Sequence, residues 1–303
     1  MFDIIVVGGT NVDIKAKTAK PCIAGTSNPG SIAFTPGGVA RNIAHNLGLL
    51  GTKVALISVI GNDAPGEIAA KATLAAGVDL SLVMRTDTPT GAYVALLDDK
   101  GELVSAVNDM AILENLTTEF VDRHEAVLAS AKFVVVDCNV RPDLLEYLAL
   151  RFSGKLVVEP VSVAKSEKLK ALLEKHEVFL ATPNRDQVHA LADNLDVERA
   201  CSELHERGLH NLVVHLGASG SFVSTGTGVK EIPAGIRPHV SDVTGAGDAA
   251  VAGLVYGLSK GYDIPRAAQF GQAAASLKLN SNLSIAVGLT EEALQNIFKA
   301  GHE

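Results

Sequence analysis

The sequence is poor in cysteine, which leaves few thiols for disulfide bonds or for a zinc site. The three cysteines, Cys22, Cys138 and Cys201, are odd in number, and no two of them have C-x-x-C spacing. The pattern argues against a disulfide framework and against a zinc site. We therefore expect free or buried thiols.

The sequence also lacks clusters of positive charge. Its 26 lysines and arginines are scattered among 34 acidic residues, which gives a formal net charge of −8. A nucleic-acid polymer is a poor partner for such a chain, because binding to a phosphate backbone requires a basic patch. Small anions are still acceptable ligands, since backbone amides alone can bind them.

Long apolar runs are absent as well. Residues 2–7, FDIIVV, are too few for the hydrophobic region of a signal peptide, and no stretch of about 18 uncharged apolar residues occurs. No linker, charge block, low-complexity tract or internal repeat divides the 303 residues. We expect a cytoplasmic protein without membrane association, folded as one α/β domain over 1–303.

What the sequence does contain is a series of short, fully apolar segments that alternate with amphipathic ones. Such strands between helices are typical of a mostly parallel sheet covered on both faces, a three-layer αβα sandwich. The expected strands are 4–7, 54–60, 133–137, 156–159, 178–181 and 212–216. The expected helices are 39–50, 65–76, 141–150, 163–175, 186–192, 196–207, 246–259, 264–279 and 290–299.

One region has a different period. Residues 90–108 alternate with a period close to two around the turn Asp-Lys-Gly at 99–101, which predicts a β-hairpin. We expect this hairpin to join 11–17 and 31–35 in a small sheet that stands off the main one. The resulting β lid would consist of about 11–35 and 88–110.

The strongest chemical signal lies in 241–254, SDVTGAGDAAVAGL, where a glycine-rich turn opens into an apolar helix. Gly245, Ala246 and Gly247 leave their backbone N–H groups uncovered at the helix N-terminus, which favours binding of a phosphate or another anion. Asp248 in the same turn can accept a proton from a hydroxyl group beside these amides. The pattern predicts phosphoryl transfer, although the same residues also suit a simple helix start.

Two polar residues follow the first expected strand, in the segment GGTNVD at 8–13. Asn11 and Asp13 are candidate substrate ligands, because ligands bind outside the carboxyl ends of parallel strands. Asp13 could accept two sugar hydroxyl groups. Taken alone, an ordinary turn explains both residues better.

Paired glycines precede the first expected helix, in the segment PGGVARNIA at 36–44. Gly37 and Gly38 allow the backbone to approach a ligand closely, and Asn42 offers a donor and an acceptor to a ribose-like diol. A glycine helix start without a ligand is equally compatible with this pattern.

Together these segments resemble the ribokinase-like (phosphofructokinase-B) family of carbohydrate and nucleoside kinases. DVTGAGD looks like the family signature, and the Asp after the first strand and the motif GGVARN resemble its substrate half. The resemblance extends over essentially the whole chain, in the expected order. It implies ATP and Mg²⁺, Asp248 as catalytic base, the amides of 245–247 as anion hole, and a sugar or nucleoside hydroxyl group as acceptor.

The resemblance also implies which residues contact the nucleotide. HLGASG at 215–220 resembles the family's T-x-G-x-x-G motif, with His in place of the common Thr. The implied nucleotide-binding residues are Asn184, His215, Gly217, Gly220, Thr244 and Gln272.

Metal binding is where the sequence departs from the family pattern. TPNRDQ at 182–187 resembles the N-x-x-E motif that helps hold magnesium, but Gln187 replaces the expected Glu. Asp186 or Glu159 could compensate, or Mg²⁺ is held chiefly by nucleotide phosphates and water. Asp242, with the loop 280–284, is implied to bind a monovalent cation such as K⁺; its alternative role is to cap the following turn.

Several segments look more specifically like the pseudouridine kinases of this family, namely 27–51, 107–110, 136–139 and 282–286. This implies phosphorylation of the 5′-hydroxyl group of pseudouridine, with Asp13, Gly38 and Asn42 on the ribose and Asn139 as a further substrate contact. Asn108 and Asp109 are expected to hydrogen-bond the uracil edge, although such a pair at a hairpin end is as often a simple turn.

Other functions are open at this point. Within the family, the substrate could be ribose or another nucleoside, such as inosine, guanosine or cytidine. Gln187 and His215 could mark a sugar or nucleoside sensor with weakened catalysis, but a pure sensor has no need of Asp248. A dehydrogenase fits poorly, because the full G-x-G-x-x-G motif is missing. The family also implies a homodimer formed through the lid, whose exposed edge would gain from pairing.

Overall fold

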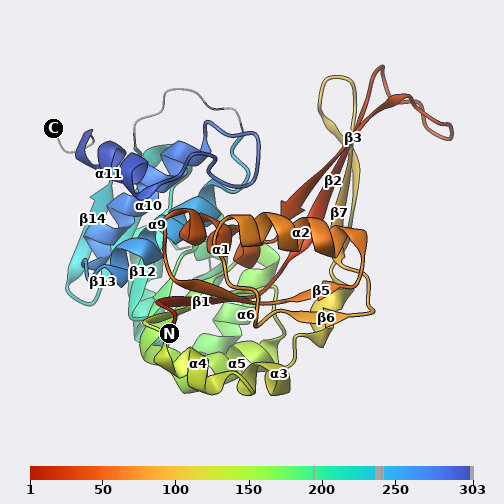
Figure 1. Ribbon diagram of the computed structural model, residues 1–303. Helices are drawn as coiled ribbons and strands as arrows, with labels where there is room; N and C mark the ends of the chain where they lie inside the picture. Colours follow the sequence, from red (N-terminus) through yellow and green to blue (C-terminus); the bar gives the residue numbers. More distant parts are fainter. Residues whose placement is uncertain (194, 236–239, 241, 301–303) are drawn as a thin grey trace.

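The computed structural model describes residues 1–193, 195–235, 240 and 242–300, so Ser241 of the glycine-rich segment lies outside the description. A central sheet and a smaller sheet that projects away from it determine the shape of the described part (Figure 1). In sheet order, the central strands are β14 (Gly228–Ile232), β13 (Ser221–Thr225), β12 (Asn211–His215), β11 (Leu180–Ala181), β10 (Leu156–Glu159), β9 (Phe133–Asp137), β1 (Ile4–Val7) and β4 (Val54–Ile57). Neighbours from β12 to β4 are parallel, whereas β13 and β14 pair antiparallel.

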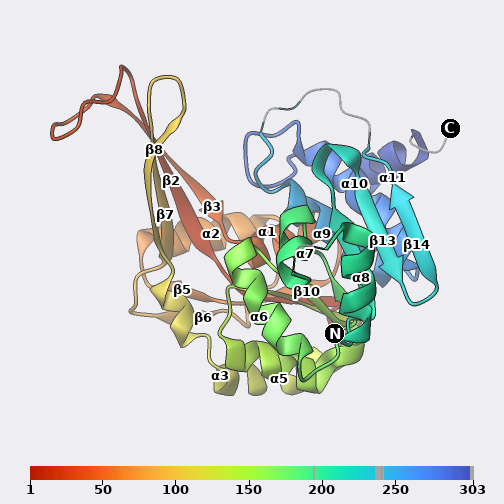
Figure 2. The ribbon, with the colours of Figure 1, turned by 180° about the vertical axis from the view of Figure 1, so that it is seen from behind.

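Helices cover both faces of the central sheet, which confirms the expected three-layer αβα sandwich. Because successive strand residues point to opposite faces, Ile5 and Val7 pack on one side and Ile4 and Val6 on the other. The first side is covered by α3 (Thr118–Asp122), α4 (Glu125–Ser130), α5 (Pro142–Phe152), α6 (Val163–Leu173), α7 (Arg185–Leu191) and α8 (Val197–Glu206), as Figure 2 shows. The second side is covered by α1 (Val39–Leu49), α9 (Ala246–Ser259), α10 (Ile264–Lys278) and α11 (Glu291–Ala300).

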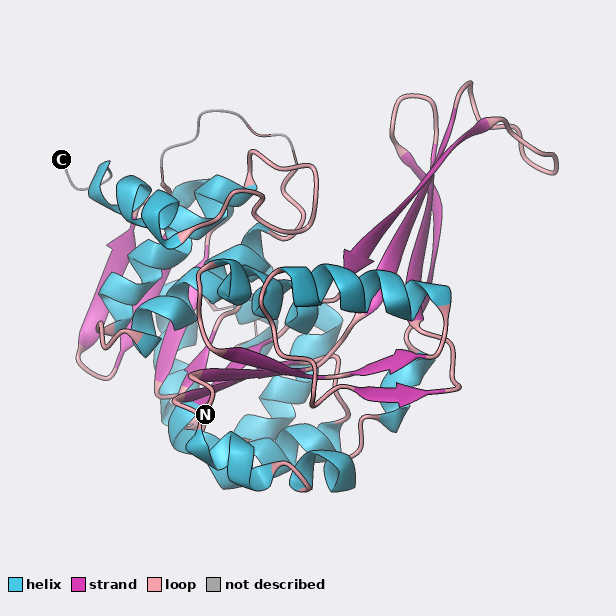
Figure 3. Cartoon of the chain, in the orientation of Figure 1, coloured by secondary structure: helices cyan, strands magenta, loops and turns pink. Residues whose placement is uncertain are grey.

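The smaller sheet contains the segments expected to form a lid. Its strands in order are β3 (Gly30–Gly37), β2 (Asn11–Thr18), β7 (Gly91–Leu97) and β8 (Leu103–Asp109). The central pair β2 and β7 is parallel and the outer pairs are antiparallel. Figure 3 shows the sheet projecting beyond α2 (Ala64–Ala75), with the short pair β5 (Val59–Gly61) and β6 (Met84–Thr86) near its base.

The register of the smaller sheet gives it two unlike faces. A polar row of cross-strand neighbours on one face consists of Thr35, Asp13, Tyr93 and Asn108. The adjacent row, on the opposite face, is apolar and consists of Phe34, Ile14, Val94 and Val107. Phe34 is 53% exposed and Val107 is 65% exposed, so this apolar row is open to solvent.

Most of the expected elements are confirmed, and the differences have local causes. The expected strand 54–60 is divided at Ser58, whose hydroxyl group donates to Gly8 O at 2.7 Å, and its second part pairs with β6. The antiparallel strands β13 and β14 were not expected, because they lie outside the alternation of apolar strands and helices. Short helical turns occur at η1 (Ala111–Asn115), η2 (Ser153–Lys155) and η3 (Gly217–Ser219).

Within residues 1–193, 195–235, 240 and 242–300, no helix is both long and apolar enough to cross a membrane.

Candidate active site

The glycine-rich turn leads directly into α9, and its first glycine has two structural reasons to be glycine. Gly245 is the N-cap and has φ 82°, in the left-handed region. A Cβ atom there would lie 2.1 Å from the carbonyl oxygen of Ser284, so the turn packs tightly against the loop after α10. A Cβ atom at Gly247 would meet none of the described atoms within 4 Å. The turn at Gly247 therefore borders open space, as anion binding requires. The amide of Ala246, expected to be uncovered, instead donates to Val243 O at 3.1 Å.

Asp248 is held in the first turn of α9 by a long-range hydrogen bond. Asn42 Nδ2 donates to Asp248 Oδ2 at 2.7 Å, between residues 206 positions apart. Burial is the main cause that raises the pKa of Asp248 to about 7; the charges of Asp137 and Asp13 act in the same direction, and Asn42 and Arg41 act against it. A carboxylate whose pKa is near neutral pH is suited to general-base catalysis.

Arg41 determines which way the amide of Asn42 points. Its guanidinium group is buried and donates to the carbonyl oxygens of Pro36 and Gly37 and to Asn42 Oδ1. Because a guanidinium group has donors and no acceptor, the amide oxygen of Asn42 faces Arg41 and its NH₂ group is left for Asp248. Burial lowers the pKa of Arg41 to about 10, and the charge of Asp248 acts against this.

Asp137, at the end of β9, joins three segments of the site. The side chain is fully buried, and its Oδ2 accepts from Gly9 N at 3.0 Å and from Ala40 N at 2.9 Å. Its Oδ1 accepts from Asn139 N at 2.9 Å. A Cβ atom at Gly8 would lie 2.5 Å from Asp137 Cγ, so the glycine makes room for the carboxylate. One side chain thus fixes the end of β1, the start of α1 and the loop after β9.

The structure brings together the polar residues of β2 and the paired glycines before α1. Asn11 Nδ2 donates to Asp13 Oδ1 at 2.8 Å. A Cβ atom at Gly37 would lie 2.7 Å from that same oxygen, and one at Gly38, where φ is 98°, would lie 2.4 Å from Gly9 O. Burial raises the pKa of Asp13, and the bond from Asn11 acts against this. These residues form a compact polar corner at the base of the lid.

Asn139 lies in the loop between β9 and α5 and contacts a lysine that the sequence reasoning did not identify. Lys165 Nζ, on α6, donates to Asn139 Oδ1. Burial lowers the pKa of Lys165, and the charge of Asp137 acts against this. The amide oxygen of Asn139 therefore faces α6, which leaves its NH₂ group for another partner.

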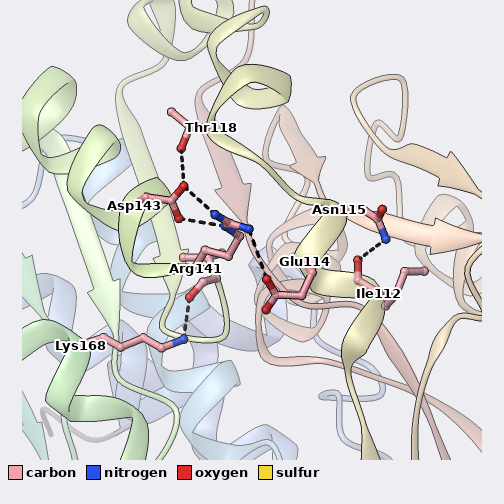
Figure 4. Close-up of polar contacts among 8 residues, drawn as sticks. Ile112, Glu114, Asn115, Thr118, Arg141, Asp143 and Lys168 are labelled. Atoms are coloured by element: carbon pink, nitrogen blue, oxygen red, sulfur yellow. Dashed lines mark hydrogen bonds and ion pairs between the residues drawn. The ribbon is translucent and has the colours of Figure 1, made fainter.

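A network of ion pairs supports the loop that carries Asn139 (Figure 4). Arg141 pairs with Asp143 at 2.9 Å and with Glu114 at 3.3 Å. Lys168 Nζ donates to the carbonyl oxygen of Val140 at 2.7 Å. These contacts join the loop to η1, α5 and α6, so it is braced from several elements.

The structure separates two lid residues that the sequence had placed on the same ligand. Asn108 belongs to the polar row that includes Asp13. Asp109 is the next residue of β8 and therefore points to the opposite face. Its Oδ1 accepts from Ala111 N at 3.0 Å, which is the turn role named as the alternative. Of the two, Asn108 is the one on the face of Asp13.

A cavity of about 440 Å³ opens beside the N-terminus of α9. Its lining includes His215, Gly217, Gly220, Gly247 and Gln272. Gln272 Nε2 donates to Ser221 Oγ at 2.6 Å, and Ser221 Oγ lies 3.4 Å from His215 Nδ1. A concave, mostly apolar pocket with a few fixed polar groups is typical of a small-molecule site, and it gathers most of the residues expected to contact a nucleotide.

Asn184 and Gln187 are bound to each other at the start of α7, outside that lining. Gln187 N donates to Asn184 Oδ1 at 2.9 Å, and Asn184 N donates to Gln187 Oε1 at 2.8 Å, which forms a capping box. Asp242 Oδ1 likewise caps the turn that follows by accepting from Thr244 N at 2.8 Å, which is the role named as its alternative. The amide oxygen of Gln187 is thus used to hold a helix, and this geometry gives its expected metal role no support.

The two acidic residues expected to compensate for Gln187 have different surroundings. Glu159 accepts from Thr182 Oγ1 at 2.6 Å and from Val161 N at 3.1 Å, and burial raises its pKa to about 8. Asp186 is exposed in the first turn of α7. In the part of the chain that the structure describes, no three or more His, Cys, Asp or Glu side chains group to hold a metal ion. This donor set fits Mg²⁺ bound through nucleotide phosphates and water.

The residues expected to bind a monovalent cation surround a lysine ammonium group instead. Lys278 Nζ donates to the carbonyl oxygen of Asp242 at 2.7 Å and to that of Ser281 at 3.0 Å. The lysine is fully buried. Carbonyl oxygens are the groups that replace the hydration shell of K⁺, and here they already face a positive charge. The residues of this place therefore do not fit K⁺.

Sequence reasoning missed four charged residues, namely Arg41, Asp137, Lys165 and Lys278. Asp137 carried a usable signal, because it ends an apolar strand at the edge where ligands bind. The lysines carried none, since the partner of Lys165 is 26 positions away, and Lys278 joins Ser281 to Asp242, which is 36 positions away.

Comparison with known proteins gives consistent matches along the chain. Residues 1–290 match the model of the pfkB family of carbohydrate kinases. The chain is 35% identical over 306 residues to pseudouridine kinase of Escherichia coli K12, covering 96% of this chain and 97% of that protein. It is 27% identical over 346 residues to pseudouridine kinase of Arabidopsis thaliana, covering 92% and 90% of the two chains. The solved structure of a carbohydrate kinase from Agrobacterium tumefaciens superposes with TM-score 0.86 at 30% identity, covering 99% and 97% of the two chains.

Proposed function

The chain belongs to the pfkB family of carbohydrate kinases, and we propose that within this family it transfers the γ-phosphoryl group of ATP to the 5′-hydroxyl group of pseudouridine. The family makes it a sugar or nucleoside kinase, a phosphotransferase that acts on a hydroxyl group. The observation that carries the mechanism is the place of Asp248, a carboxylate with pKa about 7 in the first turn of α9, where Gly247 borders a cavity of about 440 Å³. The 35% identity to a pseudouridine kinase supports the choice of substrate.

Asp248 is proposed to act as the general base. Its carboxylate takes the proton of the 5′-hydroxyl group as that oxygen attacks the γ-phosphorus, and the bond from the γ-phosphorus to the β,γ-bridging oxygen breaks to release ADP. The proton leaves Asp248 for solvent after the product departs. Asn42 keeps one carboxylate oxygen in a fixed direction, so the other faces the acceptor.

The anion hole (the backbone amides of 245–247) is proposed to stabilise the charge of the transferring group. These amides lie at the positive end of α9, where they favour a developing negative charge, and the amide of Ala246 would share or exchange its bond to Val243 O to take part. Mg²⁺ bound to the nucleotide phosphates would neutralise part of their charge. Because such transfers depend mainly on positioning and charge neutralisation, one base and a fixed set of amides are sufficient protein machinery.

The polar corner at the base of the lid is proposed to bind the nucleoside. Asp13 and Asn42 offer acceptors and donors to the ribose hydroxyl groups, and Gly38 permits a close approach to the backbone. Asn139 offers the NH₂ group that its contact with Lys165 leaves free to turn toward substrate. Asn108 is proposed to reach the uracil edge from the lid.

The cavity beside α9 is proposed to hold the adenosine part of ATP. His215, Gly217, Gly220 and Gln272 line it, and its edge at Gly247 joins it to the anion hole. The γ-phosphate would then point from the cavity toward Asp248. Asn184 caps the start of α7, and Thr244 N donates to Asp242, so these two residues are proposed to support the segments around the cavity without lining it.

The lid is proposed to close over the nucleoside and to mediate a homodimer. Closure would exclude water, which otherwise competes for the phosphoryl group. The apolar row from Phe34 to Val107 faces away from Asp13 and is solvent-exposed in the isolated chain, so a second copy could cover it.

The direct test is release of ADP with Mg²⁺-ATP across pseudouridine, uridine, inosine, guanosine, cytidine and ribose. The assay is run at pH 8, where Asp248 is ionised. We expect a strong preference for pseudouridine, and a loss of about 10²–10⁴-fold in kcat for Asp248→Asn, the contribution of a general base. A preference for another nucleoside or for ribose would show that pseudouridine is not the substrate, but it would still support a kinase activity. Binding without turnover would favour a sensor.

A further inference from the structure

Lys278 supplies a positive charge that the mechanism above does not use. We propose that its ammonium group takes the place of a monovalent cation beside the anion hole, so that this protein does not depend on K⁺. The kinetic part of this inference rests on the proposed kinase activity. Its structural part, that the ammonium group joins two loops in the way an ion would, stands on the geometry alone.

The ammonium group lies between the two loops that frame the start of α9. Lys278 is the last residue of α10, and its Nζ reaches Asp242 O in the loop before α9 and Ser281 O in the loop after α10. The same second loop contributes the Ser284 carbonyl group that packs against Gly245. The lysine therefore fixes the distance between two loops whose contact shapes the anion hole.

The charge of Lys278 is compatible with this buried place. Burial lowers the pKa of Lys278 and Lys15 acts in the same direction, whereas the negative charges of Asp242 and Asp248 act against this. The position at the C-terminal end of α10 is also favourable for a cation, because the helix dipole is negative there. An ammonium group donates up to three hydrogen bonds and so suits a cluster of carbonyl oxygens.

A metal ion would find the same place unsuitable. K⁺ must exchange its hydration shell for several protein oxygens, and two of the carbonyl oxygens at hand already accept from Lys278. A second cation would also meet the ammonium charge at close range. The lysine thus supplies the positive charge that a bound ion would supply, and it links the two loops that the ion would link.

The first experiment measures the wild-type reaction in KCl and in tetramethylammonium chloride at equal ionic strength. We expect rates within about twofold, since screening is the same in both. A several-fold stimulation of the wild type by K⁺ would overturn the proposal.

Two substitutions separate charge from space. Lys278→Ala removes the ammonium group and leaves room among the carbonyl oxygens, so we expect at least a tenfold loss of kcat in tetramethylammonium chloride and a partial recovery in KCl or NH₄Cl. Lys278→Met removes the charge but fills the space, so we expect a similar loss without recovery. Lys132→Ala is the control, because Lys132 also donates to a backbone carbonyl, that of Ser259, at 3.2 Å, but pairs with Asp3 beside the first strand of the main sheet.

A purely structural role for Lys278 would not produce recovery by a cation. Loss of activity in both variants without any cation response, or wild-type activity in both, would each overturn the proposal. Melting temperature gives a second readout: it should rise with K⁺ for Lys278→Ala and not for the wild type or Lys278→Met. If no nucleoside is turned over, the proposed function fails, and the melting series still tests Lys278. If the variants do not fold, the proposal is tested by comparing the wild-type rates in KCl and in tetramethylammonium chloride.

Discussion

Asp248 combines properties that a surface aspartate does not have. The residue is half-buried, and its carboxylate accepts from Asn42 at 2.7 Å and lies near two other carboxylates, those of Asp137 and Asp13. The buried guanidinium group of Arg41 compensates part of this negative charge. The outcome is a carboxyl group that is protonated in mild acid and ionised at slightly alkaline pH, which suits the proposed role in proton transfer.

This environment makes stability depend on pH in a predictable direction. The pKa of Asp248 is raised to about 7 in the folded protein, so the native state holds a proton that the unfolded state loses near the ordinary value of 3.8. Stability from this group is full below the unfolded pKa and is lost as pH rises through the folded pKa. Asp248→Asn removes the ionisation, so its melting temperature should exceed that of the wild type increasingly from pH 4 to 7 and by a constant amount above.

Glu102→Gln is the control for that measurement, because Glu102 is exposed in the turn of the lid hairpin. Its melting temperature should follow that of the wild type across the whole pH series. An Asp248→Asn protein that is less stable than the wild type at pH 8 would contradict the assigned role of burial.

Helix α9 shows how one element is defined by the glycines at its ends. Gly245 precedes its first turn with φ 82°, and Gly261 follows its last turn with φ 87°. The first glycine touches the loop after α10, whereas a Cβ atom at Gly261 would meet none of the described atoms within 4 Å. The same conformation thus serves a crowded site at one end and an open helix terminus at the other.

Alanine at these two positions should therefore have unequal effects. Gly261→Ala should cost about 1–2 kcal/mol of unfolding free energy, the penalty of the left-handed conformation alone. Gly245→Ala adds a clash with Ser284 O and should cost about 3 kcal/mol or more, with loss of most activity. Chemical denaturation and ADP release measure both. Equal destabilisation by the two substitutions would mean that the loop after α10 can move away from the added Cβ atom without a cost in free energy.

Elements were predictable from the sequence where their cause is local. The turn into α9 has three small residues before a carboxylate, and the φ of 82° at Gly245 is a backbone reason for the first of them. The capping box of Asn184 and Gln187 is equally local, yet the resemblance led to a metal role for Gln187. The bonds of Asp137 to Gly9 and Ala40 were not predictable, because they join residues about a hundred positions apart and depend on the packing of β9 beside β1.

At the scale of the whole molecule, the candidate site is built from two sheets. The central sheet brings the ends of β1, β9 and β10 to one edge, while the smaller sheet carries Asp13 and Asn108 on its polar face. The lid strands were predicted because hairpin alternation is a sequence pattern. The parallel pairing of β2 with β7 was not, because it joins segments some eighty residues apart.

The exposed apolar row of the lid leads to a prediction about assembly. Phe34→Glu should convert a dimer, with twice the 31.5 kDa chain mass, into a monomer, because a buried unpaired carboxylate disfavours the interface. Light scattering after size-exclusion chromatography measures this. Leu150→Glu is the control, since Leu150 is 67% exposed on α5, away from the lid, and should leave the mass unchanged. A wild-type chain that is monomeric at all concentrations would reject the lid dimer.

The hydrogen bonds of Asp137 also constrain the order in which the site can form during synthesis. The amides of Gly9 and Ala40 emerge from the ribosome first, but the carboxylate that accepts from them follows by 128 and 97 positions. Until β9 has emerged and docked beside β1, the amides of Gly9 and Ala40 lack the carboxylate that accepts from them in the folded chain. A nascent chain that ends before residue 137 therefore carries Asp13, Gly38 and Asn42 without the carboxylate that joins β1 to the start of α1.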